Sequence, residues 1–342
     1  MIHDALSLVL ERRDLSREQA SRAMTAIMSG EATAAQIAAL LAALRMKGET
    51  IDEIAGFAMA MRTFATPVHT SRRPLVDTCG TGGDCAGTFN VSTTAAFVVA
   101  GAGVAVAKHG NRSASSRCGS ADVLEKLGVR IDMSAAEVGQ CIDEIGIGFL
   151  FARSFHQAMR HVAPVRSELG FRTVFNLLGP LTNPASACGQ VVGVPDRKLV
   201  EPIAYVLSSL GARRAFVVSG ADGLDELTLA ASTCVAEARG GSVQTYELTP
   251  EDVGLPRAPR EALLGGDAEA NAHILLDVLK GVRGPHRDIV LFNAAAGILA
   301  GSDTEADWRG AVDAANQSID SGAAFEKLEA LIRYGSIAGA NA

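Results

Sequence analysis

Residues 75–84, LVDTCGTGGD, run from an apolar segment straight into a glycine-rich loop. The segment Leu75–Thr78 is short and apolar, which is typical of a buried strand. Three glycines in the next five positions free the backbone to present N–H groups to an anion. No Gly-Lys-Ser/Thr follows, as it would in a P-loop, and Cys85 stands where a dinucleotide fingerprint has its last glycine. We therefore favour an anion-binding loop over a plain strand-to-helix turn.

Beyond Pro74 the sequence alternates between short apolar runs and helical patterns. This alternation predicts an α/β fold whose mostly parallel sheet has helices on both faces. Ligands in such folds bind beyond the carboxyl ends of the strands. The expected strands are Leu75–Thr78, Val104–Ala107, Ile147–Phe151, Gln190–Val194 and Ala215–Ser219. The clearest expected helices are Ser120–Leu127, Ser134–Ile145 and Arg197–Leu210, the last beginning a few residues in because of Pro202.

The first 66 residues show only helical patterns. Three capping boxes, each followed by a stop signal, predict three helices there. The stretch Ala34–Leu44 carries Ala and Leu on nearly every side, so we expect it to be buried, in part at a subunit interface. We predict a small all-helical N-terminal domain, residues 1–72, and a large α/β domain, residues 73–342. The capping pairs are Ser16 with Gln19, Thr33 with Gln36 and Thr50 with Glu53.

The composition excludes several classes of protein. Of the 342 residues, 48% are hydrophobic and 20% charged, and the net charge is −7. Nucleic-acid binders usually have a strongly basic balance, so a local site must hold any anionic ligand. The six cysteines contain no C-x-x-C pair, which disfavours zinc and fits free thiols in the cytoplasm. The longest apolar run, Ala95–Ala107, is interrupted by glycines, so we expect no membrane span.

A second candidate anion site is the segment 108-KHGNRSASSR-117, which follows an expected strand. It carries three formal positive charges, one histidine and three serines within ten residues. A charge run is usually a solvated loop, but Gly110 and the serines suit close approach to a phosphate. In an acidic protein, this segment is the clearest candidate binding site for a strongly anionic substrate.

Other motifs are open to two interpretations on their own. The segment 88-TFNVSTT-94 either caps a helix or binds an anion at the helix N-terminus. Asp225 and Glu226 follow the expected strand Ala215–Ser219, where they could ligate Mg²⁺ or simply begin a helix. His156 and Arg166 are isolated residues, which are usually structural or solvated, and only the neighbouring sequence suggests a functional role for them.

Taken together, these segments resemble those of the anthranilate phosphoribosyltransferases, and in the same order. The resemblance covers essentially the whole chain but weakens beyond Gly240, where only the segment 293-NAAA-296 is similar to the family. The segments that carry it are Gly80–Asp84, Asn90–Thr93, Lys108–Ser116, Ser120–Glu125, Arg166–Pro184 and Asp225-Glu226.

The resemblance implies a fold of the nucleoside phosphorylase and phosphoribosyltransferase kind and a homodimer formed through the helical domain. It also implies transfer of the phosphoribosyl group of phosphoribosyl pyrophosphate (PRPP) to anthranilate, with Mg²⁺ as cofactor, in tryptophan biosynthesis. A hinge near residues 166–190 would return to the helical domain. Cys79 and Cys85 stand where the family more often has apolar or glycine residues, which leaves the detailed shape of the glycine loop open.

The resemblance also implies site residues. PRPP would be held by Gly80, Gly83, Asp84, Thr88, Asn90, Val91, Ser92, Thr93, Lys108, His109, Gly110, Asn111, Arg112, Ser113, Ala114, Ser115, Ser116 and Ser120. Mg²⁺ would be held by Ser92, Asp225 and Glu226. Anthranilate would contact Gly80, Asn111 and Arg166, with His109 and His156 lining its path.

Chemistry suggests how such a site would act. Mg²⁺ and Lys108 would stabilise the departing pyrophosphate, and the neutral aromatic amine needs no strong base, so we assign no nucleophile or base. We expect Arg166 to pair with the anthranilate carboxylate, because its planar guanidinium can bind both carboxylate oxygens. Arg172 is the nearest competitor for this role, but it is expected at the start of a helix. Two alternatives are a pyrimidine nucleoside phosphorylase, disfavoured by the acidic pair and Lys108–Asn111, and a nucleic-acid-binding relative, disfavoured by the acidic charge.

Overall fold

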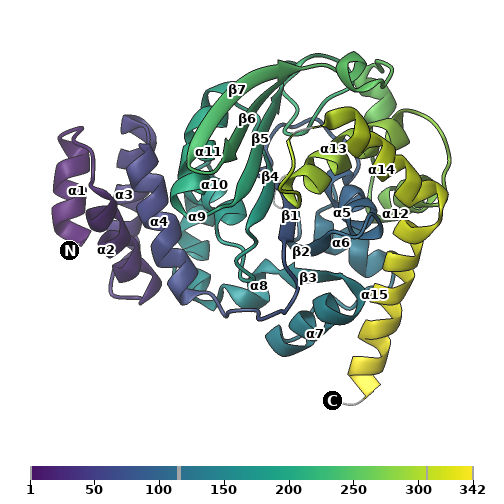
Figure 1. The fold of residues 1–342 in the computed structure, drawn as a ribbon. Coiled ribbons are helices and arrows are strands. Elements are labelled where there is room, and N and C mark those ends of the chain that lie inside the picture. The colour runs from purple at the N-terminus through teal and green to yellow at the C-terminus, as the bar shows by residue number, and fades with distance from the viewer. Residues whose placement is uncertain (1, 114–116, 306, 341–342) are drawn as a thin grey trace.

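The computed structural model describes residues 2–113, 117–305 and 307–340, with only the backbone of 337–340. Figure 1 shows a helical bundle beside a central sheet, with a second, thicker layer of helices on the far side of that sheet. In these ranges, no helix combines the length and the apolar character needed to cross a bilayer.

The N-terminal bundle consists of α1 (Ile2–Leu10), α2 (Arg17–Met28), α3 (Ala34–Lys47) and α4 (Ile51–Phe64). All three predicted capping boxes are confirmed, each with a side chain accepting from the N3 backbone and a reciprocal bond back. Glu53 does more than cap α4. Its fully buried carboxylate also accepts from the backbone N–H of Leu15 at 2.9 Å and from the Lys47 ammonium at 2.9 Å. It thereby ties three helices of the bundle together.

The sheet has seven strands in the order β3-β2-β1-β4-β5-β6-β7. The five predicted strands are confirmed and are all parallel, with small shifts at their ends. They are β1 (Leu75–Gly80), β2 (Ala105–Gly110), β3 (Ile147–Phe151), β4 (Gly189–Gly193) and β5 (Arg214–Gly220).

Two strands were not predicted. An antiparallel hairpin, β6 (Thr233–Arg239) and β7 (Ser242–Leu248), extends the sheet beyond β5. Gly240 and Gly241 make its two-residue turn with φ of 57° and 85°, which is the geometry that Gly-Gly favours between twisted strands. Most of β7 is exposed or half-buried, so the hairpin lacks the apolar run that marked the other strands.

One predicted boundary was wrong in a way that matters for the site. β2 continues through Gly110, so Lys108 and His109 lie within the strand and not in a loop after it. Their backbone groups pair with β3, and both side chains are buried. The basic segment therefore begins inside the sheet and emerges only from Gly110 onward.

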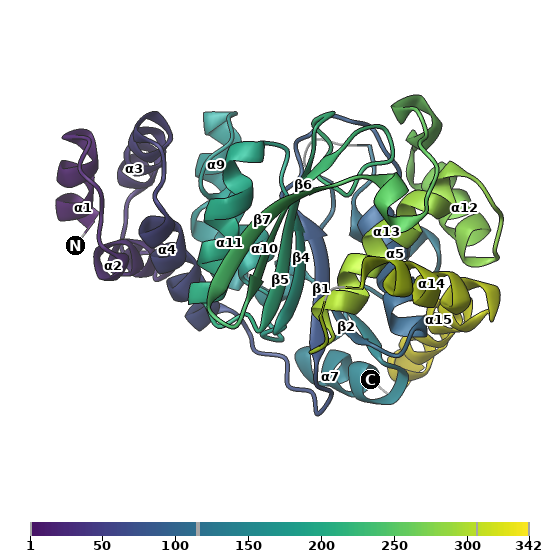
Figure 2. The same ribbon diagram turned by 45° about the horizontal axis from the view of Figure 1, so that its top comes forward.

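Helices cover both faces of the sheet, as predicted (Figure 2). A large apolar core joins β1–β3 to the helices of the C-terminal half. A second core runs without a break from the N-terminal bundle to one face of β4–β6. The helices after β1 are α5 (Val91–Gly101), α6 (Ser120–Lys126), α7 (Ala135–Ile145), α8 (Ala152–Phe155), α9 (Ala163–Leu169), α10 (Phe175–Leu181), α11 (Val200–Ser209), α12 (Ala268–Leu279), α13 (Pro285–Ala300), α14 (Trp308–Asp320) and α15 (Ala323–Ala340), and the 3₁₀ turns are η1 (Gln157–His161), η2 (Arg197–Leu199), η3 (Pro250–Val253) and η4 (Arg260–Leu263).

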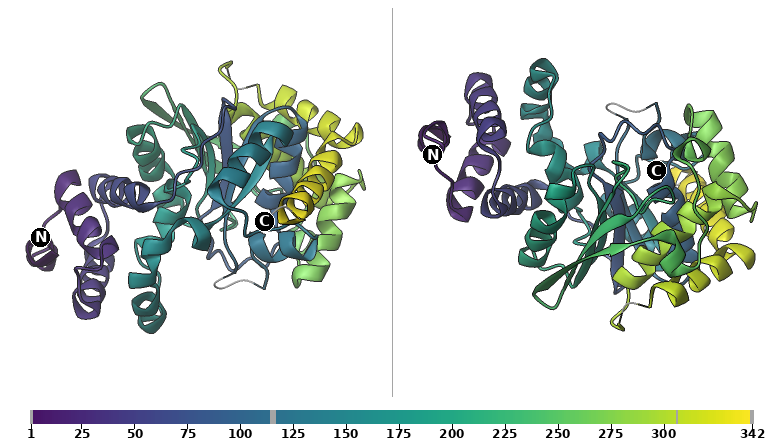
Figure 3. Two further views of the ribbon diagram at one scale, coloured as in Figure 1. Left: turned by 90° about the horizontal axis from the view of Figure 1, so that it is seen from below. Right: turned by 90° about the horizontal axis from the view of Figure 1, so that it is seen from above.

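The segment between β3 and β4 returns to the bundle. Figure 3 shows the teal helices that follow β3 lying alongside the N-terminal helices. α9 packs against α3, and α10 packs against α4. The chain reaches β1 from α4 through a connection at 65–74 in which Val68 is the only buried residue. The proposed domain division at residues 72/73 falls in this connection.

Candidate active site

The glycine loop Gly80–Asp84 leaves the carboxyl end of β1 in a shape that favours glycine. Gly82 and Gly83 have φ of +64° and +85°, and a Cβ on Gly83 would lie 1.5 Å from Nη1 of Arg172. A Cβ on Gly80 would lie 2.6 Å from Oδ2 of Asp225. Cys85 also adopts a left-handed φ of 54°, which a glycine would accept at no steric cost.

The acidic pair lies directly against this loop. Asp225 and Glu226 sit in a turn after β5 and do not begin a helix, so the helix-start interpretation was wrong. The backbone N–H of Gly82 donates to Oδ2 of Asp225 at 2.9 Å. Gly193, at the end of β4, leaves room for this turn, because a Cβ there would lie 1.5 Å from the Asp225 carbonyl oxygen. Sequence reasoning missed Gly193, since one glycine at a strand end carries no distinctive signal.

Crowding makes the ionised form of these carboxyl groups unfavourable. Burial, together with the charge of Asp84, raises the pKa of Asp225 to about 7. Burial and the neighbouring Asp225 raise the pKa of Glu226 well above its ordinary value. A nearby divalent cation would favour the ionised carboxylates and relieve this repulsion.

The donor set fits Mg²⁺. The backbone N–H of Ser92 faces the Glu226 carboxyl group and partly opposes the rise of its pKa, so the fold brings the three residues expected to hold the metal close together. All their side-chain donors are oxygen atoms, as Mg²⁺ prefers. In the described part of the chain, no three His, Cys, Asp or Glu side chains form a ready-made metal cage. A cation here would therefore need further oxygen ligands, such as those of a bound phosphate.

Lys108 lies beneath the site and does not project into solvent. It is 4% exposed, and its ammonium donates to the backbone carbonyl of Thr78 in β1. Burial raises the pKa values of Asp77 and Glu226, and the charge of Lys108 opposes both rises, so Lys108 lies near the buried Asp77 and the half-buried Glu226. This position suits a cation that balances the acidic site from below.

The basic segment beyond β2 is only partly available to a ligand. Arg112 pairs with Asp122 at 2.9 Å and with Glu125 at 2.7 Å, so its charge is already shared with α6. The Ser120 hydroxyl donates to the Asn111 carbonyl at 3.3 Å, and Gly110 leaves space for that hydroxyl. Ala114, Ser115 and Ser116 lie outside the described residues, and Ser113 is described.

The segment before α5 is held from two directions. Asn90 does not cap the helix; its amide donates to the Cys118 carbonyl at 3.2 Å and accepts from Asn271 at 2.9 Å. Thr88 forms a β-bridge with Leu264. The side chains of Val91 and Thr93 are buried, so these two residues can offer a ligand only their backbone groups. Asn271 and Leu264 were missed, because they lie where the sequence resemblance is weak.

Of the residues expected to meet anthranilate, His109 and His156 are neighbours, and Arg166 lies in α9, which packs against α3 of the bundle. The rings of His109 and His156 lie 5.1 Å apart, and burial lowers their pKa values to about 3 and about 4, so both are neutral. Among the described atoms, Nε2 of each ring has no hydrogen-bond partner. The Arg166 guanidinium lies over the ring of Phe175, 5.5 Å from its centroid. Burial, together with the charge of Arg172, lowers the pKa of Arg166.

Comparison with known proteins identifies a family that covers nearly the whole chain. The glycosyl transferase family, helical bundle domain, matches residues 3–65, and the glycosyl transferase family, a/b domain, matches residues 72–325. The chain is 59% identical to the anthranilate phosphoribosyltransferase of Symbiobacterium thermophilum over 329 residues, 96% of each chain. It is 56% identical to that of Moorella thermoacetica over 334 residues, 98% of each chain.

Solved structures of the same family superpose on this chain over nearly its whole length. The crystal structure of anthranilate phosphoribosyltransferase from Thermus thermophilus superposes with a TM-score of 0.92 at 50% identity, covering 97% of this chain and 99% of that one. The enzyme from Saccharomyces cerevisiae in complex with PRPP and Mg superposes at 0.89 with 29% identity, covering 98% of each chain. By sequence and by fold, the chain belongs to the anthranilate phosphoribosyltransferase family.

Proposed function

We propose that this chain transfers the phosphoribosyl group of PRPP to the amine of anthranilate. The products are N-(5-phosphoribosyl)anthranilate and pyrophosphate, a step of tryptophan biosynthesis. The observation that carries the proposal is the hydrogen bond from Gly82 N–H to Asp225, which joins a phosphate-binding loop to a pair of metal ligands. No disulfide joins any of the six cysteines, all of which lie in the described ranges, and this supports a cytoplasmic location.

The residues on the donor side would hold PRPP by its charged ends. Backbone N–H groups of the glycine loop and of the start of α5 would bind phosphate oxygens. Asp225, Glu226 and Ser92 would hold Mg²⁺, which when bound supplies positive charge to the departing pyrophosphate. Lys108 would favour the ionised form of Glu226 from below, so its contribution to the leaving group is indirect.

The residues on the acceptor side would fix the angle of attack. Arg166 carries a planar fork that can pair with both oxygens of the anthranilate carboxylate. The described residues give its guanidinium no carboxylate partner, so that fork is available. The aromatic amine is itself neutral near pH 7 and so remains nucleophilic, and the neutral rings of His109 and His156 would line its path. Rate enhancement would then come from alignment and from charge stabilisation at the leaving group.

The two alternatives have little support. A pyrimidine nucleoside phosphorylase would not need the crowded acidic pair beside the glycine loop. The net charge of −7 disfavours a nucleic-acid-binding relative, because such proteins usually have a strongly basic balance. The relatives from Symbiobacterium thermophilum, Moorella thermoacetica and Thermus thermophilus, at 50% identity and above, are named as the transferase.

The direct test is fluorescence-detected consumption of anthranilate. With PRPP and Mg²⁺ the purified protein should consume anthranilate and release pyrophosphate in equal amounts. Replacing PRPP by ribose 5-phosphate is the control, since that compound has no pyrophosphate to displace. A folded protein that consumes no anthranilate under these conditions would refute the proposed activity.

The acidic pair has opposite effects on function and stability. Asp225→Asn with Glu226→Gln should reduce turnover by about a thousandfold or more, because the metal loses its protein ligands. The pKa of Asp225, about 7, lies above its ordinary 3.8, so this group costs stability as the pH rises from about 4 to about 7. The metal-free double variant should therefore unfold at a temperature equal to or above that of the parent at pH 8.

Calorimetry and steady-state rates at pH 5 and pH 8 measure both effects. The matched control is Asp313→Asn on α14, remote from the sheet edge. Near-normal turnover of the double variant at saturating Mg²⁺ would remove the pair from the metal site.

Arg166→Ala should raise the KM for anthranilate by about tenfold or more and leave the KM for PRPP nearly unchanged, because a charge-assisted pair with the carboxylate is lost. Arg166→Lys should recover only part of the loss, since an ammonium keeps the charge but not the planar fork. Steady-state kinetics with each substrate varied in turn measure both constants. Weaker PRPP binding with unchanged anthranilate binding would show that the assignment is wrong.

We also propose that the chain forms a homodimer through its helical bundle. The bundle exposes Leu10 and Met46, by 66% and 78%. The other large apolar side chains of α3 are already buried within one chain, so the interface would rest on these side chains and on exposed alanines. Light scattering at micromolar concentration should give twice the chain mass for the parent and a lower mass for Leu10→Glu with Met46→Glu. A monomeric parent would contradict the proposal.

A further inference from the structure

We propose that Arg172 is a positioning residue that holds the glycine loop in its ligand-binding shape. Its activity readout rests on the proposed function, but its binding readout does not. Arg172 lies in the connection between α9 and α10, six residues after Arg166. The sequence suggested a helix start at this position, but α10 begins only at Phe175. Arg172 is therefore free to reach across to β1.

The guanidinium lies directly against the loop. Nη2 of Arg172 donates to the carbonyl oxygen of Thr81 at 3.2 Å. A Cβ on Gly83 would lie 1.5 Å from Nη1 and 2.5 Å from Cζ, so this side chain occupies the space that a residue other than glycine would need. Gly83 thus serves two purposes, since it has a positive φ and it admits a guanidinium.

Two opposite charges hold one peptide unit. The carbonyl of Thr81 and the N–H of Gly82 belong to the same planar peptide group. Arg172 donates to its oxygen, and Asp225 accepts from its nitrogen. Both hydrogen bonds are charge-assisted, and they act at opposite ends of the plane. The N–H of Thr81 is fixed in turn by the carbonyl of Gly193 at 2.8 Å. Rotation of this peptide would break both charge-assisted contacts.

The same cation acts on both halves of the site. Burial raises the pKa of Asp225 on the donor side, which the charge of Arg172 opposes, and burial lowers the pKa of Arg166 on the acceptor side, to which the charge of Arg172 adds, so Arg172 lies near both. It comes from the segment that packs against the helical bundle, whereas the loop belongs to the sheet. Arg172 therefore links the position of the acceptor segment to the shape of the donor loop.

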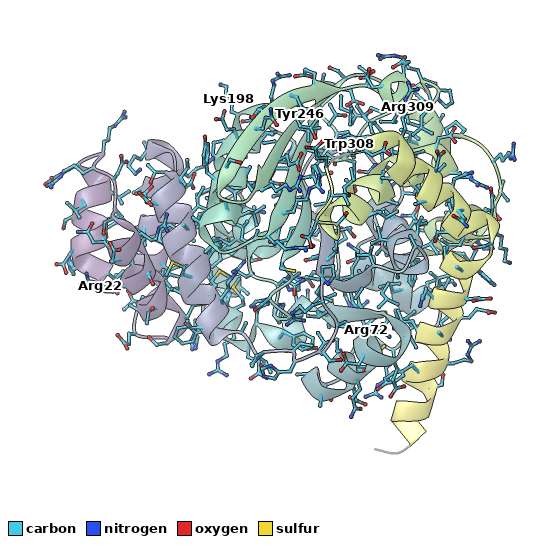
Figure 4. The ribbon with its side chains drawn as sticks, viewed as in Figure 1. Arg22, Arg72, Lys198, Tyr246, Trp308 and Arg309 are labelled. Atoms are coloured by element: carbon cyan, nitrogen blue, oxygen red, sulfur yellow. The ribbon has the colours of Figure 1, made fainter. Side chains whose placement is uncertain are left out.

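The first experiment measures PRPP binding by calorimetry in the presence of Mg²⁺ and without anthranilate. Arg172→Ala should weaken PRPP binding by about tenfold or more, because a hydrogen bond from a charged donor is lost. Steady-state kinetics should show a larger change in the KM for PRPP than in kcat. Arg172→Lys should recover part of the affinity. Arg22→Ala, far away on the bundle (Figure 4), is the control and should bind as the parent does.

The second experiment separates positioning from general destabilisation by comparing two glycines. Gly83→Ala should weaken PRPP binding strongly in the parent, since its methyl group meets Arg172. In an Arg172→Ala background the same change should cost several-fold less, because the obstructing side chain is gone. Gly82→Ala is the matched control: it has a positive φ but no atom within 4 Å of the added Cβ, so its cost should be the same in both backgrounds.

The possible outcomes are distinct. Parent-like PRPP affinity in Arg172→Ala, or equal costs of Gly83→Ala in the two backgrounds, would overturn the inference. Should Arg172→Ala not fold, the Gly83 and Gly82 comparison is made in the Arg172→Lys background, whose shorter head group should still relieve part of the collision. A parent that binds PRPP but does not consume anthranilate would refute the proposed function and leave these binding measurements valid.

Discussion

The buried carboxylate of Asp77 joins three parts of the chain on which the site depends. It has no exposed surface, and burial raises its pKa, so it must be satisfied by hydrogen bonds and by a nearby cation. The backbone N–H of His109 in β2 and the amide of Asn183, just after α10, both donate to it, at 3.1 Å and 2.8 Å. Asn183 also donates to the Ala107 carbonyl at 2.8 Å, which fixes the returning segment to the sheet. With this arrangement in place, Lys108, His109 and the α9–α10 connection all take defined positions.

Above this buried arrangement, the site concentrates unfavourable features. Two glycines and Cys85 have positive φ, and Asp225 and Glu226 repel each other in a half-buried space. Such features persist only where the surrounding structure holds them, and they are typical of functional sites. Here Gly193 makes room for the acidic turn, and Arg172 together with Asp225 fixes the loop. A divalent cation would relieve this repulsion and would also attract a polyanionic substrate, so binding of the metal should stabilise the fold.

The sequence predicted the parallel strands and the helix starts well, because apolar runs and capping boxes are local signals. It failed for the β6–β7 hairpin, whose outer strand is mostly exposed and so lacks an apolar run. The motifs likewise located the glycine loop, the basic segment and the acidic pair. They could not show contacts between residues far apart in the sequence. Arg112 forms ion pairs with two residues of α6, and Lys108 is buried. Arg172 hydrogen-bonds to Thr81, which lies 91 residues earlier in the chain. Those contacts depend on tertiary packing, which no local pattern reports.

The central claim is that metal and pyrophosphate meet between the glycine loop and the Asp225–Glu226 turn. Anomalous diffraction from crystals grown with PRPP and Mn²⁺, a spectroscopic substitute for Mg²⁺, locates the metal directly. The account predicts an anomalous peak within bonding distance of a carboxylate oxygen of this pair and of a PRPP phosphate oxygen. It would be contradicted by a peak elsewhere in the molecule, or by PRPP density away from the loop Gly80–Asp84.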